Sequence, residues 1–311
     1  MRVTSNSFPS SLVNQLGQLS DLQNRLQTQI STGQRIQLPQ DDPVATQQVL
    51  GIQTEVSTLA QQQSNIAHEQ ELASSTYNAI NGLKTISDRA NEIATLADGT
   101  KSPQDLATYA SEVTELIKQG VEAANTQIGG SYLLAGTQND QPPFSLTTDS
   151  NGLVTGVSYQ GNTSLAENEV ASGVTMSAQT LGANSTGSGP RGLVTDSRSG
   201  ADLFNHLIAL QNHLTSGDTS TIASQDRGNL SKDEDNLLFH VSANSAVQAR
   251  LEAASSSASD RTTSLQQRLS SETSTDMAQT IVRLNQTQNA YRAALASGSQ
   301  ILNLSLLDYL K

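Results

Sequence analysis

The sequence predicts a mainly α-helical protein with an inserted β-domain, and three observations support that fold class. Apolar residues recur at alternating steps of four and three over long stretches near both ends of the chain, which is the spacing of a helical stripe. Only 35% of the 311 residues are hydrophobic and 3% aromatic, too little for a thick globular core. Glycine and proline gather in one internal region. We therefore expect an elongated antiparallel helical rod formed by the N- and C-terminal segments, with coiled-coil-like terminal helices.

The first helix is predicted near the N-terminus. Its apolar positions follow a heptad spacing with one polar interruption, Gln23. They are Leu12, Leu16, Leu19, Leu26 and Ile30. Ser10 or Ser11 can cap the start of this helix, and Gly33 can cap its end. We expect residues 1–45 to form this terminal helix and a bend after it.

Two adjacent acids, Asp41 and Asp42, lie in the polar stretch STGQRIQLPQDDPVA of residues 31–45. Paired carboxylates can act in acid–base or metal chemistry, but no third ligand is visible near this pair. Asp42 immediately precedes Pro43, and proline is favoured in the first turn of a helix. We therefore interpret Asp42 as the N-cap of a second helix and Asp41 as a favourable charge near its positive end.

The second helix is predicted from Pro43 to Ala97. If it is unbroken, its length is about 80 Å at about 1.5 Å per residue. A compact globule cannot contain a helix of that length. Together with the next helix it makes residues 46–128 a predicted pair of antiparallel helices in the rod.

The segment ADGTKSPQD predicts the turn between these two helices. Gly99 suits a left-handed C-cap, Ser102 an N-cap, Pro103 the first helical position and Asp105 the acidic position of a capping box. Apolar residues at helical spacing then continue as far as Ile128. The chain is therefore expected to double back.

Residues 129–200 have a different character, because 12 of the 21 glycines and three of the seven prolines fall there. Short β-rich runs around DSNG in residues 144–159 and around ASG in residues 170–176 predict two hairpins. GANSTGSGPRG, residues 182–192, is expected to be a flexible loop. The region is predicted to be a small β-domain inserted into the helical part.

Helical periodicity resumes in residues 201–275, with a stop at Gly217 and a polar SSSAS run, and we expect this segment to return along the rod. Residues 276–311 form the predicted last helix, whose stripe repeats the spacing of the first and also includes one glutamine. Its apolar members are Met277, Ile281, Leu284, Tyr291 and Leu295. The two ends of the chain therefore look like partners.

The two terminal stripes need partners, because most helical stability in proteins comes from packing an apolar face. Five apolar residues per helix make a narrow seam, and the burial would barely offset ordering costs of about 1 to 2 kcal/mol per residue. Our hypothesis is that residues 1 to about 45 and about 275 to 311 are disordered in a free monomer and ordered in an assembly.

Composition excludes several classes of function. The formal net charge is −12, with five lysines among 17 basic residues, so no basic patch exists for nucleic acid. No apolar run reaches the roughly 18 to 20 residues of a membrane span, and the N-terminus lacks the apolar region of a cleavable secretory signal. Zero cysteines exclude disulfides, thiolate zinc sites and cysteine nucleophiles.

Candidate catalytic, cofactor and metal motifs are weak. The glycines of residues 187–192 have the spacing of a dinucleotide fingerprint, but no convincing strand precedes them and Pro190 interrupts them. His68 lacks the second histidine of a zinc-protease motif, and His206 and His213 lie seven apart on a helical face. No nucleophile with a base can be chosen. We predict no enzyme activity, no cofactor and no metal.

Several motifs resemble one known family. The run MRVTSNSF and the segment LQNRLQTQISTGQRIQLPQDDPVATQQVL, residues 22–50, are similar to the N-terminal region of bacterial flagellar hook-filament junction proteins (hook-associated protein 3), relatives of flagellin. GGSYLLAGTQNDQPPF, residues 129–144, resembles that family's junction into its β-domain, with Leu134 where an aromatic residue is common. The C-terminal TDMAQTIVRLNQTQNAYRAALASGSQILNLSLLDYL resembles its closing helix.

The resemblance implies a structural protein, exported without a cleavable signal through the flagellar type III apparatus, that forms the ring joining hook to filament outside the cell. Its implied partners are further copies of itself, another hook-associated junction protein on the hook side, flagellin on the filament side and an export chaperone. The terminal helices would form an inner tube, and residues 129–200 the outer surface.

The resemblance also leads to a hypothesis about assembly residues. The apolar residues of the two terminal stripes would contact neighbouring copies. Arg35 with Asp41 and Asp42 would fix the bend between inner tube and rod, through bonds across subunits.

Two alternatives stay open. Flagellin, the filament subunit, shares the terminal helices and the rod, although the Asp-Asp-Pro sequence and the Leu-Leu-Asp-Tyr-Leu ending favour the junction protein. A secreted helical adhesin with a β-rich tip would also have this pattern.

Overall fold

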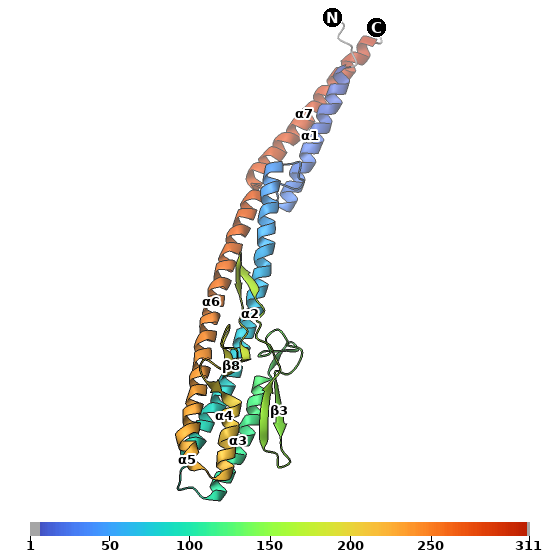
Figure 1. Cartoon of the computed structure of the whole chain (residues 1–311). Helices are drawn as coiled ribbons and strands as arrows, with labels where there is room; N and C mark the ends of the chain where they lie inside the picture. The colour runs from blue at the N-terminus through green and yellow to red at the C-terminus, as the bar shows by residue number, and fades with distance from the viewer. Residues whose placement is uncertain (1–6, 310–311) are drawn as a thin grey trace. The chain divides into compact units, whose positions relative to one another are not determined.

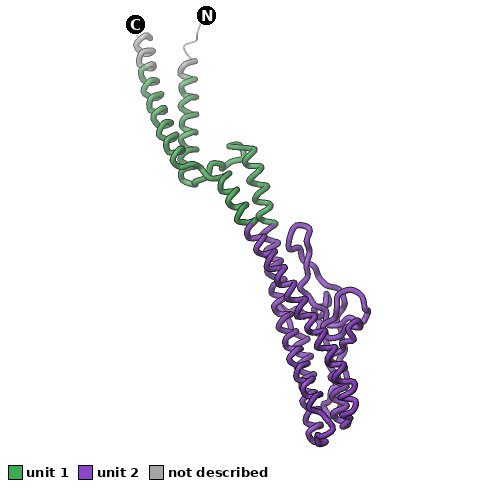
Figure 2. The backbone as a smooth tube through the Cα atoms, turned by 90° about the vertical axis from the view of Figure 1, so that its left-hand side faces the viewer, with its two compact units in different colours: residues 1–58, 261–311 green, residues 59–260 purple. Residues whose placement is uncertain are grey.

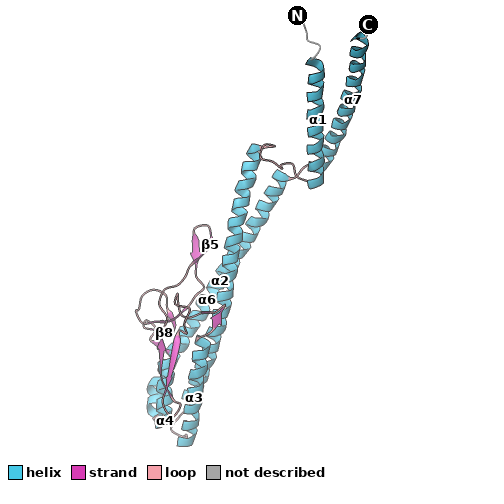
Figure 3. Cartoon of the chain, turned by 90° about the vertical axis from the view of Figure 1, so that its right-hand side faces the viewer, coloured by secondary structure: helices cyan, strands magenta, loops and turns pink. Residues whose placement is uncertain are grey.

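The computed structural model describes residues 7–309, and the chain divides into two compact units (Figures 1 and 2). Unit 1 comprises residues 1–58 and 261–311, and unit 2 comprises residues 59–260. Helices dominate both units, while the named strands lie in unit 2 (Figure 3). The prediction of a mainly α-helical chain with inserted β-structure is confirmed.

Unit 1 is built from α1 (Ser7–Thr32) and α7 (Met277–Tyr309), with the first turns of α2 (Pro43–Leu96) and the last turns of α6 (Arg227–Thr273). Leu12 of α1 lies against Gly298 of α7. At the other end of this pair, the Thr275 N–H donates to the Gly33 carbonyl at 2.9 Å. The two terminal helices are therefore antiparallel and in contact, as Figure 1 also shows.

The two ends of α1 differ in how well the sequence predicts them. Ser10 and Ser11, expected as caps, lie inside the helix, because α1 begins at Ser7. The predicted C-cap is confirmed, since Gly33 has a φ of 70° and its N–H donates to the Gln29 carbonyl at 2.8 Å. A left-handed φ costs glycine little, because it has no Cβ.

Helix α2 is unbroken from Pro43 to Leu96, as predicted, but the turn after it is built differently. Gly99 is not among the described glycines with positive φ, so the predicted left-handed cap is wrong. Instead Asp98 closes the turn, because its Oδ1 accepts bonds from the Thr100 N–H and hydroxyl at 3.0 and 2.5 Å. An aspartate that bonds two residues ahead makes glycine unnecessary here.

The predicted capping box at the start of α3 (Pro103–Ala124) is confirmed. The Asp105 N–H donates to Ser102 Oγ at 3.2 Å, and the Ser102 N–H donates to the Asp105 carboxylate at 3.2 Å. The helix ends before Ile128, which the sequence placed in it. Ile128 instead lies in strand β1, paired with Ser131 in a two-stranded sheet.

The strands form four small sheets rather than one. They are β1 (Gln127–Ile128), β2 (Ser131–Tyr132), β3 (Phe144–Thr148), β4 (Val154–Tyr159), β5 (Asn168–Ala171), β6 (Val174–Met176), β7 (Leu181–Asn184), β8 (Gly192–Asp196) and β9 (Ala201–Asp202). The predicted hairpins are the antiparallel pairs β3–β4 and β5–β6, which confirms both. The pairs β1–β2, β7–β8 and β8–β9 were not predicted.

The expected flexible loop of residues 182–192 is the clearest error in this region. Its two ends belong to β7 and β8, which pair in parallel. The Asn184 side-chain amide donates to the carbonyls of Ser188 and Pro190 at 2.7 and 2.6 Å, which fixes the turn between the strands. Glycine and serine enrichment therefore marks a tight turn here and not a linker.

The C-terminal helices of unit 2 follow the strands. Helix α4 (Leu203–Ser216) ends at Gly217, whose φ is 73°, as predicted. The short α5 (Thr219–Thr221) and the π-helical η1 (Ile222–Asp226) lead into α6, which continues through the polar serine run as far as Thr273.

The core of unit 2 lies between α2, α3, α4 and α6 and under the strands. Its most deeply buried members are aliphatic: Ile80, Leu83, Ile93, Val113, Ile117, Leu203, Leu207, Leu210, Leu214, Leu230 and Leu237. Gln211 connects this core to a strand, because its buried amide exchanges bonds with the Val154 backbone at 3.0 and 3.3 Å. The same amide oxygen accepts from the Thr114 hydroxyl at 2.9 Å. The strands are therefore anchored on the helices.

Candidate assembly site at the break between the terminal and long helices

Two interruptions of the helices in unit 1 lie side by side, one after α1 and one between α6 and α7. The Arg35 N–H donates to the Thr273 carbonyl at 2.6 Å, and the Thr275 N–H donates to the Gly33 carbonyl at 2.9 Å. These two bonds run in opposite directions between the two segments, and Gln34 and Ser274 form an isolated antiparallel bridge there. The N-terminal and C-terminal parts of the chain therefore change direction at one shared place.

Arg35 connects three elements at this place, two through its side chain and one through its backbone carbonyl. Its Nη1 lies 2.9 Å from Asp42 Oδ2 at the start of α2. Its Nη2 donates to the Glu272 carbonyl in the last turn of α6 at 3.1 Å. Its own carbonyl accepts from Gln29 Nε2 in α1 at 3.0 Å. A guanidinium suits this role, because its several N–H groups point in fixed directions.

Asp42 is the N-cap of α2, as the sequence predicts. Its Oδ1 accepts the Ala45 N–H at 3.0 Å, while Oδ2 faces Arg35. The Ala45 N–H and then the Arg35 hydrogen bond hold the pKa of this carboxyl below its usual range. The side chain is therefore an anion at neutral pH and is used as a cap.

Asp41 closes the bend before the cap. Its Oδ2 accepts the N–H groups of Leu38 and Gln37 at 3.0 and 3.2 Å. These two bonds, with Leu38 the larger cause, hold the pKa of Asp41 below its ordinary value. Its Oδ1 lies 3.8 Å from Arg25 Nη1 on α1. Both acids thus make their bonds within the chain, in an arrangement that orders backbone and leaves no free carboxylate pair for acid–base work.

The five predicted apolar residues of α1 lie on one face. Leu26 is buried at 5% exposure, and Leu12, Leu16, Leu19 and Ile30 are half-buried. Leu12 touches Gly298, so this face is directed toward α7.

The predicted apolar residues of α7 differ in how deeply they are buried. Leu284 and Tyr291 are half-buried, whereas Met277, Ile281 and Leu295 are 41%, 45% and 46% exposed. The buried face contains Thr280, Thr287 and Gly298 instead. These small residues were missed by a search for large apolar side chains. They recur at intervals of seven and eleven residues, but the larger apolar residues recur as regularly, so spacing alone does not identify them.

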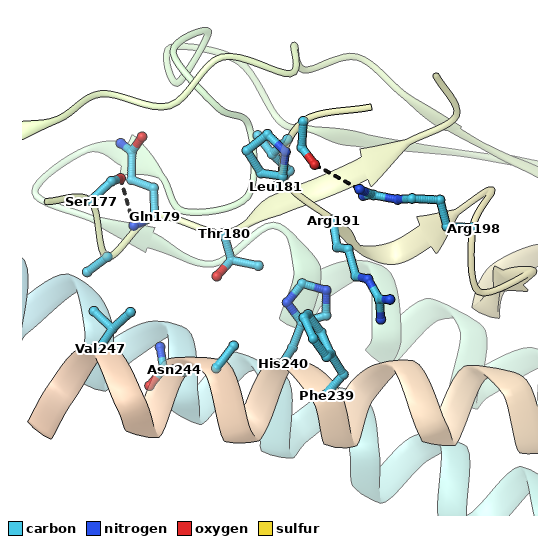
Figure 4. Close-up of a pocket in the computed structure, with 14 residues that line it drawn as sticks. Ser177, Gln179, Thr180, Leu181, Arg191, Arg198, Phe239, His240, Asn244 and Val247 are labelled. Carbon is cyan, nitrogen blue, oxygen red and sulfur yellow. Dashed lines mark hydrogen bonds between the residues drawn. The ribbon is translucent and has the colours of Figure 1, made fainter. Parts of the chain in front are cut away.

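Unit 2 contains a cavity of about 400 Å³ beside α6, shown in Figure 4. The Arg191 guanidinium lies 4.1 Å from the centroid of the Phe239 ring. His240 Nε2 lies 3.1 Å from the Gly192 carbonyl, and burial lowers the pKa of this histidine to about 4. Arg198 is held by the Asp196 carboxylate at 2.7 Å. At neutral pH the cavity therefore contains an uncharged imidazole.

Two of the other three histidines are paired with aspartates. His206 Nδ1 lies 2.7 Å from Asp233 Oδ2, and His213 Nδ1 lies 2.8 Å from Asp226 Oδ2. Each pair connects α4 with the segment that leads into or forms α6. His68 is exposed on α2.

No group of three or more histidine, aspartate or glutamate side chains within residues 7–309 is placed to hold a metal ion. In the same part of the chain, no helix is both long enough and apolar enough to cross a membrane.

The chain is similar to known flagellar proteins. Residues 3–139 match the family model of the bacterial flagellin N-terminal helical region. The chain is 30% identical over 119 residues to flagellar hook-associated protein 3 of Escherichia coli strain K12, a match that spans 38% of this chain and 38% of that protein. The aligned part is thus less than half of either chain.

Three solved structures have a similar fold. The first, assigned as a flagellar hook-associated protein of Vibrio parahaemolyticus, is matched with a TM-score of 0.64 and 20% identity over 75% of this chain and 100% of that one. FlgL of Bacillus cereus gives a TM-score of 0.56 at 17% identity, over 71% and 99% of the two chains. Hook-associated protein 3 of Legionella pneumophila gives 0.51 at 14%, over 76% and 98%.

The resemblance found in the sequence motifs is confirmed: residues 3–139 are similar to the bacterial flagellin N-terminal helical region, and the fold is similar to that of solved flagellar hook-associated proteins.

Proposed function

We propose that this protein is a structural component of the bacterial flagellum that joins the hook to the filament. The observation that carries the proposal is the combination of a flagellin-type N-terminal region with the fold of hook-associated protein 3. The chain's own features agree with a structural part. Its two adjacent acids, Asp41 and Asp42, order the bend.

The parts of the chain receive roles in this proposal. Residues 1–45 and 276–311 form the inner tube, residues 46–128 and 201–275 form the helical layer around it, and residues 129–200 face outward. The apolar stripes of the terminal helices and the bend held by Arg35, Asp41 and Asp42 are the assembly site. The pairing of α1 with α7 supports this role, because it leaves large apolar side chains exposed.

The partners follow from the same proposal. The protein binds further copies of itself in a ring, another hook-associated junction protein on the hook side and flagellin on the filament side. A chaperone accompanies its export, and its place of action is outside the cell on the flagellum.

The first alternative is that the protein is flagellin itself. The match to a flagellin N-terminal region is consistent with this alternative. Purified protein distinguishes the two. A filament subunit polymerises into long filaments on seeds, whereas a junction protein stops at short assemblies. Electron microscopy of the salted-out protein gives the answer.

A secreted adhesin is the second alternative, and deletion of the gene tests it together with the main proposal. We expect the deletion strain to have hooks without filaments and to release monomeric flagellin into the medium, and we expect the wild-type gene to restore filaments. A deletion strain that swims with normal filaments would overturn the proposal and favour an adhesin.

A further inference from the structure

One face of α7 has no partner within unit 1. Met277, Ile281 and Leu295 are each more than 40% exposed, and they are spaced along one side of the helix. Met277 lies three positions before the buried Thr280, and Leu295 lies three positions before the buried Gly298, so this side is turned about 60° from the residues that face α1. Three large aliphatic side chains on one stripe are unusual on a surface that faces only water.

A hollow of about 600 Å³ lies on another side of the same unit, between α1 and the bend. Leu22 and Leu38 provide its apolar surface, and Leu38 is 52% exposed. Its polar rim includes Asp21, Gln37 and Arg25. The hollow thus combines aliphatic surface with carboxamide and charged groups, as the margin of a protein interface does.

The hollow begins beside the contact between the terminal helices, since Leu22 lies four positions before Leu26, about 40° around α1, and it extends away from that contact. Asp21 and Thr28, which line the hollow, each lie two positions after Leu19 and Leu26, or about 200° around the helix. A second chain can therefore enter the hollow while α7 keeps its place on α1. Because the hollow and the exposed stripe are different patches, a contact between them is head-to-tail and repeats from copy to copy.

Charges on the two surfaces are complementary. Arg292 follows the exposed stripe of α7, and within the described residues it makes no ion pair. Asp21 lies at the rim of the hollow and likewise has no ion-pair partner in that part of the chain. Arg25, its neighbour, is directed to Asp41. Each surface therefore offers one charge that the single chain leaves unused.

We propose that the Met277–Ile281–Leu295 stripe of one copy packs into the Leu22–Leu38 hollow of the next copy, with Arg292 paired to Asp21. The inference rests on the proposed function, in which copies assemble, and it names the two surfaces and their direction. A second copy is favoured as the occupant because both complementary surfaces are present in one unit of one chain.

Charge reversal tests the direction of the contact. Asp21→Arg and Arg292→Asp each put like charges together, and we expect each full-length variant to self-associate roughly tenfold more weakly than the wild-type chain. A 1:1 mixture restores association, because every contact in an alternating arrangement then joins opposite charges. The double variant restores it too. Sedimentation velocity over a range of protein concentrations measures the effect.

Arg283→Asp is the matched control. Arg283 is also exposed and lies two positions after Ile281, about 200° away around α7. We expect this variant to associate like the wild-type chain. Circular dichroism confirms in each case that the exposed substitutions leave helicity unchanged.

Cysteine cross-linking gives a second readout, and the cysteine-free chain provides no background. Under oxidation, the Leu22→Cys, Ile281→Cys double variant should form a ladder of disulfide-linked multimers, whereas each single variant should stop at a dimer or stay monomeric. Single variants that associate normally, a mixture that stays weak, or a double variant without a ladder would overturn the inference.

The same variants in cells separate this inference from the proposed function. If a deletion strain regains normal filaments from Asp21→Arg alone, the contact is wrong while the junction role stands. If even the wild-type gene has no effect on filaments, the proposed function itself fails, whatever the purified protein does.

Discussion

The Arg35 guanidinium lies between the Asp42 carboxylate, 2.9 Å away, and the Glu272 carbonyl, 3.1 Å away, and so connects the start of α2 with the end of α6. Asp42 and Glu272 are 230 residues apart in the sequence. The bend is therefore held by the N- and C-terminal parts of the chain together.

Replacing Arg35 with alanine removes both side-chain contacts. Exposed contacts of this kind contribute about 0.2 to 1 kcal/mol each, so we expect local loosening and no global unfolding. Hydrogen exchange should become faster at the Thr275 amide, which bonds Gly33 across the bend. Arg268→Ala on α6 is the control, and equal exchange in the two variants would contradict the role given to Arg35.

Asp42 has two functions that substitutions can separate. Asp42→Asn keeps a side-chain acceptor for the Ala45 N–H but loses the charge that faces Arg35. Asp42→Ala loses both, and the missing cap should cost about 1 kcal/mol. We expect thermal unfolding midpoints in the order wild type, Asn, Ala. An alanine variant as stable as the asparagine variant would show that the cap contributes nothing.

Two helical glycines form a matched pair for testing the contact of α1 with α7. A Cβ on Gly17 of α1 would meet nothing within 4 Å, so Gly17→Ala should gain up to about 1 kcal/mol of helix propensity. A Cβ on Gly298 would come within 2.5 Å of Leu12 Cδ2. Gly298→Ala should therefore gain less than Gly17→Ala, and the larger Gly298→Val should loosen the pair. Hydrogen exchange in α1 measures both, and equal protection in Gly298→Val and the wild type would refute the contact.

His240 should make unit 2 sensitive to acid. Burial lowers the pKa of His240 to about 4, below the ordinary value of 6.5, so the folded state resists protonation. The contribution of neutral His240 to the free energy of unfolding is complete above about pH 6.5. It is lost as the pH falls toward 4, and the loss is on the order of 3 kcal/mol. Two charged neighbours shift the pKa of His240 in opposite directions, since Asp196 raises it and Arg191 lowers it.

Urea unfolding of His240→Gln measures this effect. The variant should lose part of the acid sensitivity between pH 6.5 and 4, whatever its stability at pH 7. His68→Gln, an exposed change on α2, should keep the full dependence. A His240→Gln profile parallel to the wild-type profile would show that other groups cause the loss.

The local features of the fold could be predicted because they depend on neighbours in the sequence. The Asp42 cap, the Ser102–Asp105 capping box and the left-handed Gly33 each involve residues within four positions of one another. The chemistry of such caps is fully visible in a short stretch. Gly99 shows the limit, because Asp98 supplies an equally local solution that makes the glycine cap unnecessary.

The inward face of α7 could not be predicted from spacing. Ile281 and Leu295 fit a heptad as well as Thr280 and Thr287 do, and hydrophobicity favours the first pair. Only the close approach of Leu12 to Gly298 decides which face turns toward α1. A contact between helices at opposite ends of the chain is decided by shape, which the apolar pattern of one helix does not contain.

The long-range polar contacts were missed for a similar reason. Gln211 bonds the Val154 backbone, and His206 bonds Asp233, although each looks in the sequence like an ordinary residue of a helical face. The parallel pair of β7 and β8 was hidden by a glycine-rich composition that also describes linkers.

The location of the protein on the cell tests the central proposal most directly. Ser172→Cys gives one exposed thiol at the turn between β5 and β6 in a chain that otherwise has no cysteine, so a maleimide dye labels one defined position. In a deletion strain complemented with this variant, we predict one short spot of label at the base of each filament, next to the hook. Label along the whole filament would instead assign a filament subunit, and label over the cell body with unlabelled flagella would contradict any junction role.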